Sequence, residues 1–158
     1  MAEHEYQARV HWERGAATFT DSRYCRGHSW HFDGGLDVPA SASPFVVRPP
    51  FSVEKAIDPE EALVAALSSC HMLWFLALAA QRHLCIDEYT DDAVGEMGRN
   101  ANDRMAMVCV TLRPRASFSG ERLPTREELM QLHHRAHEEC FIANSVTTEV
   151  RVEPQFDG

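Results

Sequence analysis

The stretch "DPEEALVAALSSCHMLWFLALAA", residues 58–80, decides the fold because it predicts one long helix that is apolar on almost every side. Asp58 can cap this helix, Pro59 suits its first position, and Glu61 completes a capping box. A helix that is apolar all round is buried in protein or in lipid. The run is about the minimum length for a membrane span, but the polar residues 68–71 ("SSCH") interrupt its middle. We therefore expect a central helix covered by protein, and no membrane span.

The residues before this helix predict three short strands. Residues 4–12 alternate apolar and polar side chains, which indicates a half-buried strand. Residues 29–38 read as two strands joined by Asp33-Gly34-Gly35, where glycine tolerates the positive φ of a tight hairpin. Residues 39–57 contain four prolines and follow neither period. We expect an irregular segment there, either a functional lid or a plain surface crossing.

The residues after the helix predict two further strands, a second helix and a last strand. Residues 93–120 give two strands around a turn at residues 100–103. Thr125 can cap the second helix and Glu128 completes its capping box. Residues 146–152 alternate as a strand does.

This order of elements predicts an α+β fold with a mostly antiparallel sheet and a long buried central helix, in a single domain over residues 1–158. A helix that is apolar on every side needs more cover than one small sheet supplies. A second subunit is the simplest remedy, with the long helices packed together at a two-fold interface. We therefore expect an extensive, intertwined homodimer.

Charge and cysteine usage limit the setting of the protein. The 158 residues carry a formal net charge of −9 without a cluster of Lys or Arg, so nucleic acid is not an expected partner. The first residues show no basic start followed by an apolar run, so no secretory signal is expected. Five widely spaced cysteines without a C-x-x-C pair favour a reduced, cytoplasmic setting over a disulfide scaffold.

Cys70, in the middle of the apolar helix, has two interpretations. A buried cysteine is most often an inert small hydrophobe. The polar neighbours of Cys70 instead suggest a niche for a reactive thiol, and Cys140 follows a helix's last turn, where a chain reversal could bring it inward. Two thiols in one pocket permit peroxide reduction through a sulfenic acid and then a disulfide. The attacking thiol needs a nearby cation such as arginine to ionise near neutral pH.

The segment "DPEEALVAALSSCHMLWFLALA", with "HHRAHEECFIANSV" seventy residues later, resembles the OsmC/Ohr family of thiol-dependent hydroperoxide reductases. In that family an N-P-E-[EQ]-L segment precedes an A-A-C helix, and the second cysteine lies in a C-P-x-S setting. The order of strands and helices is similar over nearly the whole chain. The resemblance implies an OsmC/Ohr-like fold and reduction of organic hydroperoxides to alcohols.

The resemblance also implies roles for particular residues. Cys70 matches the peroxidatic cysteine and Cys140 the resolving cysteine, while Glu60 matches the glutamate of the "PE" segment. Arg26 is the best match for the arginine that activates the thiolate, and Arg23 is the second. Ten residues of straight helix separate Glu60 from Cys70 by about 15 Å, so Glu60 cannot assist its own Cys70. In the family the arginine and glutamate come from the partner subunit, which agrees with the expected dimer.

Three positions depart from the family pattern and leave the preferred hydroperoxide open. His71 replaces a small or apolar residue, Phe141 replaces proline, and Asp58 replaces asparagine. An apolar substrate tail would suit four large side chains that can equally be plain core: Met72, Trp74, Phe75 and Phe141. The resemblance implies no bound cofactor or metal, and an external dithiol reductant of the lipoyl type.

Two other functions compete with peroxide reduction. The segment "HHRAHEEC" places His133 and His137 on one helix face, and His134, His137 and Cys140 along another, a spacing that can hold zinc. A non-catalytic relative that binds a small ligand in the interface pocket is the other alternative, and His71 and Phe141 favour it.

Overall fold

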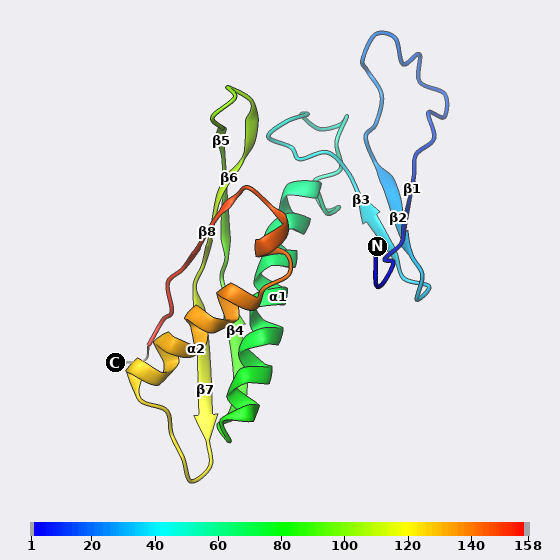
Figure 1. Ribbon diagram of the computed structural model, residues 1–158. Coiled ribbons are helices and arrows are strands. Elements are labelled where there is room, and N and C mark those ends of the chain that lie inside the picture. The colour runs from blue at the N-terminus through cyan, green and yellow to red at the C-terminus, as the bar shows by residue number, and fades with distance from the viewer. Residues whose placement is uncertain (1, 157–158) are drawn as a thin grey trace. The chain divides into compact units, whose positions relative to one another are not determined.

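The computed structural model describes residues 2–156, which divide into two compact units. The boundary lies between Ala62 and Leu63, in the first turn of the long helix. The observed class is α+β, with helices and antiparallel sheets in one chain, as expected (Figure 1). A single domain over residues 1–158 stays a prediction.

The first unit holds an antiparallel sheet in the order β1-β2-β3. Its strands are β1 (Ala8–His11), β2 (His28–Phe32) and β3 (Asp37–Ala40). The expected hairpin joins β2 to β3, where Gly35 has a φ of +90° and its N–H donates to the carbonyl of Phe32. The prediction of a half-buried first strand was wrong. All four residues of β1 are exposed, because its backbone pairs with β2 while no described residue covers its apolar side chains.

Residues 41–57 form the irregular segment that the prolines predicted, and serines fix its turns. Ser41 Oγ accepts a hydrogen bond from the N–H of Val53 at 2.9 Å. Ser52 Oγ donates to the carbonyl of Val47 at 2.6 Å. Ser41 and Ser52 are both buried, so these bonds replace the water that their polar groups lose. Whether the segment acts as a lid stays a prediction.

Helix α1 (Pro59–Gln81) begins with the capping box that the sequence predicts. Asp58 Oδ1 accepts from the N–H of Glu61 at 2.8 Å, and Glu61 Oε2 accepts from the N–H of Asp58 at 3.2 Å. Within one chain α1 is covered on one face, and the further cover expected from a second subunit stays a prediction. The buried residues form a single stripe at every fourth position, namely Leu67, His71, Phe75 and Ala79. The opposite face is open, with Leu73 59% exposed.

Among residues 2–156, α1 is the one helix that is long and apolar enough to cross a membrane. Its most apolar window has a mean hydropathy of 1.9, and 22% of that window is buried. Length and composition are weak evidence for a span, since the core helix of a soluble protein meets the same test. A hydrogen bond of 2.5 Å from Ser68 Oγ to Asp91 Oδ2 ties the middle of α1 to the neighbouring sheet.

The second unit contains two sheets, ordered β4-β7 and β5-β6-β8. Their strands are β4 (Cys85–Asp91), β5 (Val94–Arg99), β6 (Met105–Leu112), β7 (Pro114–Ser119) and β8 (Glu149–Val152). All pairs are antiparallel except β6 with β8. The turn after Arg99 is as expected, with Asp103 donating to the carbonyl of Asn100. Two strands were predicted over residues 93–120, where three exist because residue 113 separates β6 from β7. β4 lies before that range and was not predicted.

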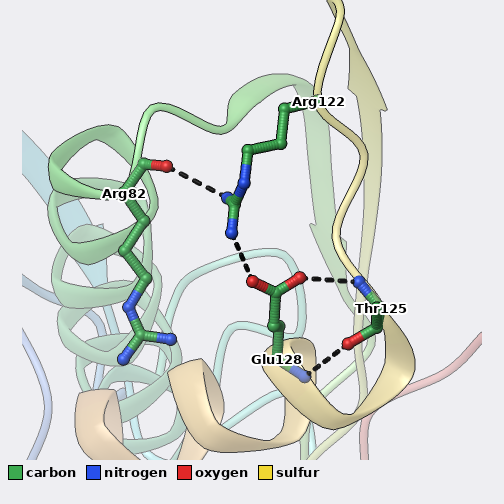
Figure 2. A network of polar contacts seen from close by, with 4 residues as sticks. All are labelled: Arg82, Arg122, Thr125 and Glu128. Carbon is green, nitrogen blue, oxygen red and sulfur yellow. Dashed lines mark hydrogen bonds and ion pairs between the residues drawn. The ribbon is translucent and has the colours of Figure 1, made fainter.

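Helix α2 (Arg126–Glu139) begins at the predicted capping box. Glu128 donates its N–H to Thr125 Oγ1 at 3.1 Å, and its carboxylate accepts from the N–H of Thr125 at 2.9 Å. Figure 2 shows that Arg122 extends this box: it pairs with the Glu128 carboxylate and donates to the carbonyl of Arg82, just beyond α1, at 3.0 Å. The start of α2 is thereby tied to the end of α1.

Two apolar clusters pack α1 within the second unit. One joins α1 to α2 through the buried residues Phe75, Ala79, Leu84, Leu132 and Ala136. The other joins α1 to β6 through Leu67, Val110 and Leu112. The same face of α1 therefore contacts a helix near its end and a sheet near its start, and the middle of α1 lies between the two clusters.

Candidate thiol site

Cys70 and Cys140, seventy residues apart in sequence, meet in the second unit. Cys70 lies in the middle of α1 and is partly exposed, whereas Cys140 is the C-cap of α2 and is 1% exposed. Both are free thiols, and the Cys140 thiol interacts with that of Cys70 through hydrogen bonding and charge. A chain reversal after α2 creates this arrangement, because the helix ends at Cys140 with an extended ψ of 112°.

The turn after α2 surrounds the sulfur of Cys140 with backbone donors. The N–H of Ala143 donates to Cys140 Sγ at 3.4 Å, and the backbone of Ile142 also bonds to it. Burial nevertheless raises the pKa of the Cys140 thiol to about 11; the amide of Ala143 acts against this shift, and the contact with Cys70 acts with it. Cys140 is thus a protonated thiol at neutral pH. A thiol in that state is a poor first attacker but can act second.

Three histidines, His71, His133 and His137, come together where α1 meets α2. Nε2 of His71 is 3.0 Å from Nδ1 of His133, and the two rings are parallel within 3°. His133 also stacks on Phe75, with ring centroids 4.1 Å apart. Burial lowers the pKa of His71 to about 4, with the charge of His137 as a second cause. Burial likewise lowers the pKa of His133 to about 3, with His71 as the second cause. Both rings are therefore neutral near pH 7.

The predicted arginine and glutamate belong to the first unit. The guanidinium of Arg26 donates to the carbonyls of Ser22 and Tyr24 at 2.9 and 2.5 Å and lies 3.7 Å from the Tyr24 ring centroid. Arg23 lies 5.9 Å from the Phe51 ring centroid. Glu60 has a buried Oε2 without a hydrogen-bond partner among the described residues. Since α1 is unbroken, Glu60 and Cys70 of one chain stay about 15 Å apart along its axis.

The four side chains predicted to line a substrate pocket have different environments. Phe141 is 68% exposed and makes an edge contact with Trp74 at 5.4 Å between centroids. Met72 is partly buried. Phe75 is a correction: it is 0% exposed and packs in the α1–α2 core against His133, so it has no surface to offer a substrate. Trp74 follows Cys70 by four residues and Phe141 directly follows Cys140, so the contact between these two rings links the chain segments of the two thiols.

The zinc interpretation of "HHRAHEEC" finds no support in the part of the chain that the structure describes. Within residues 2–156 no group of three or more His, Cys, Asp or Glu side chains is placed to hold a metal ion. His133 points to His71, and His134 forms an exposed contact with Glu138 instead. Sequence reasoning singled out both His71 and His133 but not their pairing, since nothing in the helical spacing of one segment reveals what it meets on another.

The fold and the paired thiols define a class of protein: an α+β chain whose central helix presents one cysteine to a second cysteine after another helix. The family model for OsmC-like proteins matches residues 52–155, and this chain belongs to that family. An OsmC-like protein of unknown function from Vibrio cholerae is similar along nearly its entire length. It shows 52% sequence identity and a TM-score of 0.95, over 96% of this chain and 99% of that one.

More distant solved structures share the fold alone. The organic hydroperoxide resistance protein OhrB of Bacillus subtilis has 17% identity and a TM-score of 0.69, over 98% of this chain and 100% of that chain. An organic hydroperoxide resistance protein from Elizabethkingia anophelis has 18% identity and a TM-score of 0.71, over 99% and 100%. No protein with a curated description matches this chain.

Proposed function

We propose that this protein is a thiol peroxidase that reduces organic hydroperoxides, with Cys70 as the attacking residue and Cys140 as the resolving residue. The interaction between these two free thiols, from separate helices, is the observation that carries the proposal. Membership of the OsmC-like family and the shared fold of two organic hydroperoxide resistance proteins support it.

The reaction has three balanced steps. The Cys70 thiolate attacks the terminal oxygen of the hydroperoxide, the O–O bond breaks, and the alkoxide takes a proton to leave as an alcohol. Cys70 is then a sulfenic acid. Cys140 attacks this sulfur, a disulfide forms, and the hydroxyl leaves as water. An external dithiol, with a lipoyl-type compound as the expected kind, reduces the disulfide and is itself oxidised.

The different states of the two thiols support this division of labour. Cys70 is partly exposed and therefore accessible to a substrate, whereas Cys140 is buried and protonated. Arg26 is proposed to stabilise the Cys70 thiolate, with Glu60 orienting it and Arg23 as the second candidate. Trp74, Met72 and Phe141 are proposed to contact the apolar part of the substrate.

A homodimer completes the proposal. The open face of α1, which includes the 59% exposed Leu73, is apolar surface that a second copy would cover. A partner would also supply Arg26 and Glu60 from another chain, since Glu60 cannot reach Cys70 of its own unbroken helix. The expected setting is cytoplasmic, without nucleic acid or membrane as partners.

Steady-state consumption of cumene hydroperoxide and of hydrogen peroxide, with dihydrolipoamide as reductant, tests the function. We expect faster consumption of the organic peroxide by the wild-type protein and background rates for Cys70→Ser. Cys25→Ser is the matched control, because Cys25 is an exposed thiol outside the pair. Repeated turnover by Cys70→Ser contradicts the mechanism.

A non-catalytic, ligand-binding relative is the second candidate. The relative with 52% identity is described only as an OsmC-like protein of unknown function, and the Arg26 guanidinium is held by carbonyls of its own segment. This alternative predicts that hydroperoxide leaves Cys70 and Cys140 reduced while the fold stays intact.

A further inference from the structure

The histidine pair His71–His133 is a buried polar link between α1 and α2. Its members are 1% and 5% exposed, and their nitrogens are 3.0 Å apart. One ring must donate and the other accept, so a single proton joins two neutral rings. A hydrogen bond of this kind is directional, whereas the apolar contacts around it are not.

Each member of the pair shares a helix with one of the two cysteines. His71 directly follows Cys70 on α1, and His133 lies two turns before Cys140 on α2. Phe75, one turn after His71, stacks on His133 and closes the other side of the pair. A shift of α2 along α1 by one residue's rise, about 1.5 Å, would break the 3.0 Å bond. The same shift would move Cys140 relative to Cys70.

The apolar contacts between α1 and α2 are non-directional, so they define this register less sharply than a hydrogen bond does. They include the small residues Ala79 and Ala136. A buried histidine that loses its partner leaves a polar nitrogen without water, so a shifted register is disfavoured. His71 Nδ1 and His137 Nδ1 are already buried without a described partner, which leaves the His71–His133 bond as the satisfied contact of the group.

We propose that His71 and His133 are positioning residues that set the register of α2 on α1 and so hold Cys140 against Cys70 for disulfide formation. The proposal deepens the proposed function, on which its catalytic meaning rests. It also gives a role to His71, the departure from the family pattern beside Cys70. Neither histidine touches the substrate in this proposal.

The positioning of the two thiols can be measured without any peroxide. The quantity is their effective concentration, which expresses how readily they form a disulfide with each other compared with glutathione. Equilibration of the reduced protein with glutathione and glutathione disulfide converts the two thiols to one disulfide as glutathione disulfide is reduced to two glutathiones. Peptide mass spectrometry then gives the fraction of Cys70–Cys140 disulfide. All proteins in this experiment carry Cys25→Ser and Cys85→Ser, because these exposed thiols would otherwise form mixed disulfides with glutathione.

His71→Leu and His133→Leu remove the bond, and we expect each to lower the effective concentration about tenfold, the order expected for one net hydrogen bond. His71→Gln and His133→Asn place a polar atom near the lost Nε2 and Nδ1, and we expect them to stay within about threefold of wild type. Leu132→Ala is the matched control. It truncates a fully buried neighbour of His133 and destabilises the core, but it keeps the bond.

An unchanged effective concentration in both leucine variants overturns the proposal. So does an equal loss of effective concentration in His133→Leu and Leu132→Ala. The proposal also fails if His71→Gln and His133→Asn lose as much effective concentration as the leucine variants do. If a leucine variant does not fold, the Gln or Asn variant at the same position still tests the proposal, because it should keep its effective concentration within about threefold of wild type. The glutathione measurement needs no hydroperoxide. A wild-type protein that is inert to hydroperoxide but has a high, histidine-dependent effective concentration therefore contradicts the proposed function and supports the positioning.

Discussion

The two cysteines of the candidate site have the same chemistry and opposite surroundings. Cys70 lies in mid-helix, partly exposed, whereas Cys140 lies at a helix end, 1% exposed, with backbone N–H groups directed at its sulfur. Burial raises the pKa of Cys140 to about 11. In the proposed mechanism the environments of the two thiols set the order of attack, because an accessible thiol can meet a peroxide whereas a buried, protonated thiol can only follow.

The largest expected effect comes from removing the thiol that is proposed to attack the hydroperoxide. Cys70→Ser should reduce hydroperoxide turnover to background, because a serine hydroxyl does not ionise near neutral pH and cannot become a sulfenic acid. Peroxide consumption with excess dithiol measures this effect. If Cys70→Ser kept the wild-type rate and Cys140→Ser lost it, the assigned roles would be reversed.

The next largest effect comes from removing the thiol that is proposed to form the disulfide with Cys70. Cys140→Ser should consume one hydroperoxide per chain and then stop, because the Cys70 sulfenic acid has no thiol to condense with. Labelling with dimedone, followed by mass spectrometry, should find the adduct on Cys70. An adduct that appears equally in the wild-type protein would show that Cys140 does not resolve it.

A pH dependence sharpens the comparison further. The attack by Cys140 needs its thiolate, and its pKa is raised to about 11. Below that pH the thiolate fraction rises tenfold per pH unit, so disulfide formation from the sulfenic acid should accelerate about a hundredfold between pH 7 and pH 9. Stopped-flow measurement of this single step is the check. A rate that levels off near pH 8 would contradict a protonated, buried Cys140.

The histidine pair predicts a loss of stability in mild acid. Burial lowers the pKa of His71 to about 4 and that of His133 to about 3, from 6.5. The unfolded chain therefore binds protons at these sites from pH 6.5 downward while the folded chain does not, so this stability is complete above pH 6.5 and falls as the pH drops. Between pH 7.5 and pH 5 we expect a loss of about 2 kcal/mol per histidine.

Urea unfolding at several pH values measures this loss above the range in which carboxylates titrate. The double variant His71→Leu/His133→Leu should show a flatter profile. A slope that survives in this variant would assign the acid sensitivity to other groups.

The smallest effect concerns the far end of α2. Thr125→Ala removes the capping bond to Glu128 and should lower the free energy of unfolding by about 1 kcal/mol. The surroundings of Cys140 come from the turn after the helix, so disulfide formation in Thr125→Ala should match wild type. A slower reaction would mean that the box and Arg122, which also contact the residue after α1, help to align the thiols.

Local signals in the sequence predicted a large part of the fold. Both capping boxes, the hairpin at Gly35 and the turn after Arg99 were confirmed, because each depends on residues close in sequence. β6 and β7 were predicted as one strand, because an interruption of one residue is too short to leave a signal, and β4 was not predicted. Apolar composition did not reveal which face of α1 a single chain buries, and the expected cover by a second subunit stays a prediction.

The candidate site was predictable in its members but not in its geometry. The two cysteine motifs, with the family resemblance, selected Cys70 and Cys140, which interact in the structure. Phe75 was chosen for its size and proved to be core. The bond between His71 and His133 joins residues 62 positions apart, and no periodicity within one helix encodes such a contact.

Disulfide mapping after exposure of the reduced protein to one equivalent of cumene hydroperoxide tests the central claim most directly. The account predicts a rapid Cys70–Cys140 link in the wild-type protein and none in Cys70→Ser. If both thiols stayed reduced while the protein remained folded, peroxide chemistry at this pair would be contradicted and the ligand-binding alternative would take its place.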